Sequence, residues 1–143
     1  MATYNGVNAA IIAAITPSTV LSPGLAGGNV RCFIDTYTGL GTESASETIA
    51  MGPKLPIGAR VLHMVLTQTA TGNTPDVGDA ESSERYISEA ADNAVHVSDA
   101  ITGGAYEIDE TDADNTDRQI LVLLDAAVTA AGTIKLVVFY TVE

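Results

Sequence analysis

Hydrophobic and polar residues alternate most regularly over Thr133–Glu143. Successive side chains of a β-strand point to opposite faces, so a period of two predicts a strand with one face against a core. This segment is therefore expected to be a strand with an apolar core side. The expected inward residues are Ile134, Leu136, Val138, Tyr140 and Val142.

The same period of two recurs upstream. It begins at Val30, and in Ala59–Thr69 it places Leu62, Met64 and Leu66 inward. Shorter strands are expected at 46–51, 74–78, 94–97, 105–108 and 119–124. Turn-forming residues separate about eight strands, and no helix-length segment lies between them. This organisation predicts an all-β protein, an antiparallel β-sandwich with jelly-roll-like connections.

The faces expected to point away from the core are also partly apolar. The longest internal strand presents Val61, His63 and Val65 there, and the last strand presents Val137 and Phe139. A solvated outer face would carry polar residues at these positions. We therefore expect these residues to contact another subunit. The alternative is that the N-terminal part of the same chain covers them, and the pattern does not separate the two.

Residues 1–29 follow a different pattern. Val7, Ile11 and Ile15 share a helical face, and Pro17 would end that helix ahead of an irregular Pro- and Gly-containing stretch. A disordered tail is one interpretation, but a tail that stays in water should be polar. We expect instead an N-terminal arm over 1–29 that lies on a neighbouring subunit, followed by a β-sandwich domain over 30–143. The arm's expected contact residues are Ile11, Ile12, Ile15, Val20 and Leu21.

The net negative charge of the chain disfavours some classes of binding partner. The net charge is −12, from 18 Asp and Glu against 6 Lys and Arg. So acidic a chain is repelled by phosphate, which disfavours direct contact with nucleic acid and with anionic membranes. Between Asp76 and Asp117 lie 13 of the acidic residues and one base, Arg85. That block is expected to face solvent.

The single cysteine, Cys32, excludes an internal disulfide. It alternates with Val30 and Ile34, which predicts a buried thiol in the core. No Lys or Arg precedes Arg31, so the sequence lacks the basic start of a secretory signal. We expect the protein to be made and folded in a cytoplasm.

The sequence nominates no catalytic residue and no cofactor site. Nucleophile elbows, phosphate-binding loops and dinucleotide fingerprints are missing, and His63 and His96 both lie in expected strands. We therefore expect a protein that is not an enzyme. The segment Asp109–Asp117 begins like a calcium loop but lacks its Gly and its distant Glu, so a solvated acidic turn is the better interpretation than a cation site. No metal ligand is assigned.

Four segments carry a family resemblance. In order they are Leu55–Val61 (LPIGARV), Asp76–Asp79 (DVGD), Glu84–Ile87 (ERYI) and the closing strand Thr133–Val142. The chain resembles virion proteins of tailed bacteriophages, of the capsid decoration or cement type, over roughly residues 30–143.

The resemblance implies a structural virion protein on the capsid exterior. Such a protein binds the major capsid protein at subunit junctions, stabilises the shell and is often a homotrimer. Two alternatives stay open. One is a tail, neck or fibre-associated virion component, and the other is a carbohydrate-binding β-sandwich module, which the absence of Trp disfavours.

Overall fold

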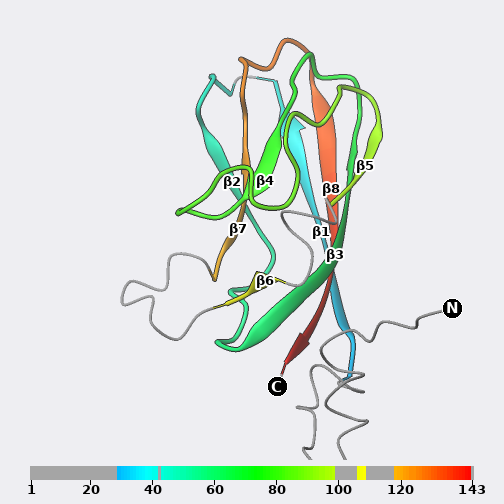
Figure 1. Cartoon of the computed structure of the whole chain (residues 1–143). Coiled ribbons are helices and arrows are strands. Elements are labelled where there is room, and N and C mark those ends of the chain that lie inside the picture. Colours follow the sequence, from blue (N-terminus) through cyan, green and yellow to red (C-terminus); the bar gives the residue numbers. More distant parts are fainter. Residues whose placement is uncertain (1–28, 42, 99–105, 109–117, 143) are drawn as a thin grey trace, which may run out of the picture.

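The computed structural model describes residues 29–41, 43–98, 106–108 and 118–142. These residues form eight strands in two antiparallel sheets, and none of them is helical (Figure 1). The strands are β1 (Arg31–Leu40), β2 (Thr48–Met51), β3 (Ala59–Gln68), β4 (Asp76–Gly78), β5 (Val95–Val97), β6 (Tyr106–Glu107), β7 (Ile120–Leu123) and β8 (Gly132–Val142). The predicted all-β antiparallel fold is confirmed. The expected contact residues of the arm, Ile11, Ile12, Ile15, Val20 and Leu21, lie outside the described residues, and so does the whole acidic segment Asp109–Asp117.

The larger sheet has five strands in the order β1-β8-β3-β5, with β6 also paired to β3. The smaller sheet has the order β2-β7-β4. In β8, which has a partner on each side, Ile134, Leu136 and Val138 are fully buried while Lys135 is exposed. The predicted faces of this strand are thus confirmed, because pairing on both edges holds the period of two along its length.

The core lies between the two sheets. Met64 and Leu66 of β3 belong to the same cluster as Met51 of β2 and Val122 of β7, and each is at most 1% exposed. The two layers face each other in Figure 1, as expected of a β-sandwich. The jelly-roll-like connections remain a prediction.

One expectation about β3 is wrong. Val61 is fully buried in the core, and Leu62 is 37% exposed. The register against β8 shifts between Val61 and His63, so one extra residue on β3 reverses the alternation at that point. Val61 therefore cannot contribute to an outer contact, whereas His63 and Val65 do face outward.

The two faces of β1 are the reverse of those expected. Cys32 is exposed, and Val30 and Ile34 are 60% and 61% exposed, whereas Phe33 and Tyr37 pack against the core. Both faces of this strand contain apolar residues, so periodicity could not choose between them. The large aromatic rings offer more area to bury, which places them inward on the edge strand.

Candidate interaction surface

The larger sheet turns one side to the core and gathers exposed apolar residues on the other. Residues directly opposite each other in antiparallel strands share a face, so rows of side chains can be followed from strand to strand. We define the outer sheet face by two such rows. The first row is Ile34, Val137, Val65 and Val97, and the second is Cys32, Phe139 and His63.

The first row crosses β1, β8, β3 and β5, which lie side by side in Figure 1. Its ends are open to solvent, with Ile34 61% and Val97 59% exposed. Val95 extends the apolar area along β5 at 63% exposure. In the second row the His63 and Phe139 rings stack with centroids 6.3 Å apart. Contiguous apolar surface of this kind on a soluble protein typically marks an interaction site.

Charge lies at the two ends of the outer sheet face and is absent from its two rows. Beyond the first row, Lys135 stands between Thr36 and Thr67. At the opposite end Arg60 forms an ion pair with Glu107 across β3 and β6. The middle of the face therefore carries no carboxylate, although the chain has a net charge of −12.

Four of the predicted contact residues come together on this surface. His63, Val65, Val137 and Phe139 are neighbours in the two rows, while Val61 lies in the core for the reason given above. The hydrophobic pattern did not nominate the flanking residues of β1 and β5. The bulk of Phe33 and Tyr37 was the available signal for β1, since two aromatics on one side favour that side as the inward one.

His63 contacts the Ser98 hydroxyl, which forms part of the hydrogen bonding between β3 and the end of β5. The Ser98 Oγ accepts the Met64 N–H at 2.9 Å and lies 3.3 Å from Nδ1 of His63, and the Ser98 N–H donates to the Met64 carbonyl at 2.9 Å. This exchange continues the β3–β5 ladder one residue beyond Val97. The Ser98 hydroxyl acts here as a substitute for backbone hydrogen bonding.

Two of the motifs that carry the family resemblance meet in the loop after β4. The Asp79 carboxylate, whose side chain is fully buried, accepts the N–H groups of Glu81 and Ser82 and two hydrogen bonds from Arg85, through Nε and, at 3.2 Å, Nη2. The Arg85 guanidinium also lies 3.9 Å from the centre of the Tyr106 ring. The Asp-Val-Gly-Asp and Arg-Tyr segments are therefore structural partners that close this loop.

A second carboxylate organises the turn after β3. Asp92 accepts the N–H groups of Thr71 at 2.8 Å and Gly72 at 2.9 Å, and the side-chain amide of Gln68 at 2.9 Å. These hydrogen bonds favour the ionised form and hold the pKa of Asp92 at about 2. Both loops thus depend on acidic side chains as acceptors.

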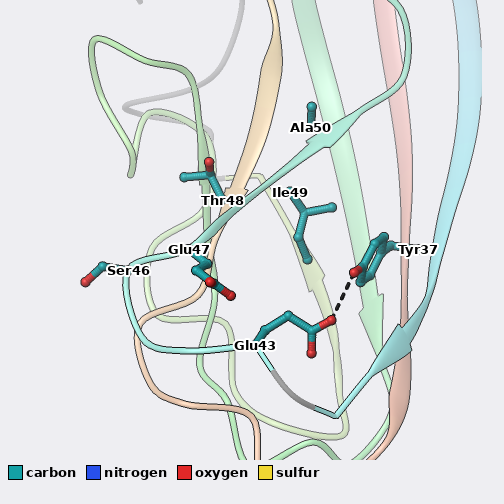
Figure 2. Close-up of a pocket in the computed structure, with 7 residues that line it drawn as sticks. All are labelled: Tyr37, Glu43, Ser46, Glu47, Thr48, Ile49 and Ala50. Atoms are coloured by element: carbon teal, nitrogen blue, oxygen red, sulfur yellow. Dashed lines mark hydrogen bonds between the residues drawn. The ribbon is translucent and has the colours of Figure 1, made fainter.

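A cleft opens between β1 and the segment that leads into β2. Its volume is about 620 Å³, and its lining residues are drawn in Figure 2. The Tyr37 hydroxyl points toward Glu43 and donates to its Oε1 at 2.9 Å, and the Gly41 N–H donates to Oε2 at 2.7 Å. The hydrogen bond from the Tyr37 hydroxyl to Glu43, together with the negative charge of Glu43, raises the pKa of the Tyr37 phenol. The contacts fasten the connecting segment to β1.

The described residues contain neither a metal-binding cluster nor a membrane-spanning helix. Among those the structure describes, no group of three or more His, Cys, Asp or Glu side chains could hold a metal ion. The described part of the chain also contains no helix long and apolar enough to cross a membrane.

The fold defines the chain as an antiparallel β-sandwich with an apolar outer sheet face, and comparisons with known proteins extend that description. No protein-family model and no curated protein sequence matches the chain. Among solved structures, a chain of the cyanophage Pam1 capsid asymmetric unit is similar, with a TM-score of 0.68 and 23% sequence identity. The match covers 89% of this chain and 95% of that chain. The likeness shows a shared fold over nearly the whole of both chains.

Proposed function

We propose that this protein is a structural component of a phage virion that decorates and stabilises the capsid. It binds the major capsid protein at subunit junctions on the shell exterior, as a homo-oligomer for which a trimer is favoured, and it catalyses no reaction. The main observation in support of this proposal is the apolar outer sheet face, whose Ile34 and Val97 are 61% and 59% exposed. The fold shared with a chain of a phage capsid asymmetric unit supports the same assignment.

The physical basis of stabilisation is linkage. A protein that binds only the assembled shell shifts the equilibrium toward that shell by RT ln(1 + [L]/Kd). The outer sheet face supplies apolar area to bury, and a central pair such as Phe139 and His63 supplies a rigid aromatic contact. Two paired sheets hold these side chains in fixed positions, so little order has to be gained on binding.

The test introduces a charge into the first row of the outer sheet face. Val97→Lys places an ammonium group where an apolar partner is expected, and Ala50→Lys makes the same change in charge at an exposed position of the smaller sheet. Each variant is incubated with shells assembled from the major capsid protein encoded in the same genome, and binding is measured by co-sedimentation. We expect Val97→Lys to weaken binding by about tenfold or more, and Ala50→Lys to leave it unchanged.

The outcomes distinguish the alternatives. Binding of the unsubstituted protein to purified tails, and not to shells, would assign it to the tail, neck or fibre. Equal loss of binding in both lysine variants would refute the role of the outer sheet face. Thermal unfolding of both variants shows whether either has lost its fold.

A further inference from the structure

We propose that, in the free protein, residues 1–28 of the same chain lie across the outer sheet face. This inference concerns the protein before any assembly and does not depend on its role in a virion. It names an occupant for an apolar surface that the described residues leave open. Three properties favour this occupant: its chemical match to the face, the point at which it joins the sandwich, and its covalent attachment.

The chemical match is between two uncharged surfaces. Residues 1–28 contain no Asp, Glu, Lys, Arg or His side chain, in a chain that otherwise carries 18 acids and 6 bases. Their apolar residues include Ile11, Ile12 and Ile15. The rows of Ile34 and Phe139 likewise carry no carboxylate, so contact between the two would bury apolar area without burying an unpaired charge.

The position of the segment makes the contact accessible. The segment joins the sandwich through Asn29 at the start of β1, which is an edge strand of the larger sheet. The adjacent Val30 is 60% exposed. Crossing from β1 to β5 spans three strand intervals, about 14 Å at about 4.8 Å each. An extended chain covers that distance in about five residues at about 3.3 Å per residue. A segment of 28 residues is long enough to turn back at Gly27 and Gly28 and cross the face.

Tethering favours the same chain over a second copy. A covalently linked segment has an effective concentration on the order of millimolar at its own sandwich, whereas free protein in a dilute preparation is on the order of micromolar. Two occupants with the same contacts would therefore differ by about a thousandfold in favour of the chain's own segment. The protein is accordingly expected to cover its own face when dilute.

The single cysteine provides the assay. Cys32 lies in the second row of the outer sheet face and is exposed among the described residues, so a covering segment must slow its reaction with a thiol reagent. The reaction of the full chain with Ellman's reagent is timed at micromolar protein concentration. Ile11→Asp/Ile15→Asp puts two carboxylates into the segment, and Ser18→Asp puts one at a position that is already polar.

We expect the double variant to react about tenfold faster than the unsubstituted chain, because carboxylates oppose burial against an apolar surface. Ser18→Asp should react at nearly the unsubstituted rate. None of the three substituted positions belongs to a described strand, and circular dichroism checks that the β-structure is retained.

A second reporter removes dependence on one thiol. In a Cys32→Ser background, Val97→Cys tests the far side of the same face, and Ala50→Cys tests the other sheet. Faster reaction of the Val97→Cys reporter, and not of Ala50→Cys, on adding the two aspartates would support the proposal.

Two results would overturn it. One is a thiol reaction that is as fast in the unsubstituted chain as in the double aspartate variant. The other is protection that grows with protein concentration together with the mass measured by light scattering, since a second copy would then supply the cover. Neither result depends on capsid shells, so failure here and failure of the proposed virion role are separate observations.

Discussion

Replacing Arg85 with Met removes the cation that the buried Asp79 carboxylate contacts in the loop after β4. Asp79 has a fully buried side chain, and the Arg85 side chain is 16% exposed. Removing one partner of a buried ion pair costs about 3–5 kcal/mol, mostly because the remaining charge is left uncompensated. Asp79 would keep its hydrogen bonds from the N–H groups of Glu81 and Ser82, which reduces that penalty.

The expected loss of stability for Arg85→Met is therefore about 2–3 kcal/mol, which is below the range for a buried charge left with no partner. It includes about 0.5–1 kcal/mol for the lost contact of the guanidinium with the Tyr106 ring. A domain of this size has a total stability of about 5–15 kcal/mol, so the variant should remain folded but melt earlier. The expected decrease in Tm is about 5–10 °C.

Urea unfolding at pH 7, followed by circular dichroism, measures the change in free energy directly. Arg85→Lys is the matched control: it keeps the charge but loses the two-pronged hydrogen bonding, so its loss should fall between zero and that of Arg85→Met. The double variant Asp79→Asn/Arg85→Met should be less destabilised than the sum of its single changes. A loss below about 0.5 kcal/mol for Arg85→Met would refute the reasoning, because substitutions away from a buried network typically have effects of that size.

Two further predictions concern the other loop contacts. The pKa of Asp92 falls from 3.8 to about 2 in the folded protein, so the stability it contributes is fully present above about pH 4 and is lost as the pH falls through 2. The urea midpoint of Asp92→Asn should therefore fall less between pH 5 and pH 2 than that of the unsubstituted protein, and equal decreases would contradict the assignment. A Cβ at Gly78 would lie 1.9 Å from the backbone oxygen of Ser82, so Gly78→Ala should destabilise the protein by about 1–3 kcal/mol. Gly41→Ala, whose nearest contact would be an ordinary 3.7 Å, should change the Tm by no more than a degree or two, and equal effects of the two alanines would refute the steric argument.

The hydrophobic pattern correctly predicted the buried face of a strand where packing on the core was the only constraint on that strand. The inward set of β8 is correct because one side of this central strand packs on the core, and Ile134, Leu136 and Val138 supply the apolar area. The strand expected at 46–51 is likewise present as β2, and its Ile49 and Met51 are buried. In these strands the hydrophobic pattern and the pairing lead to the same arrangement.

The pattern failed where two arrangements were equally apolar or where the backbone departed from regular pairing. In β1 either face could be buried, and ring size, which a hydrophobic pattern does not register, decided for Phe33 and Tyr37. In β3 the irregular register after Val61 moved that residue into the core. The pairing of Asp79 with Arg85 depends on how the loop folds, and the order of residues alone did not reveal it.

The irregular register of β3 also makes the two ends of the outer sheet face chemically different. Had strict alternation continued from His63 back toward Ala59, Arg60 would point into the core and the outer sheet face would lose its ion pair with Glu107. The extra residue gives the surface two distinguishable poles, an ion pair at one and Lys135 at the other. A chain segment or protein laid along the surface therefore meets different chemistry in each of its two orientations. A single extra residue in β3 thus allows the surface to favour one orientation of a bound segment over the other.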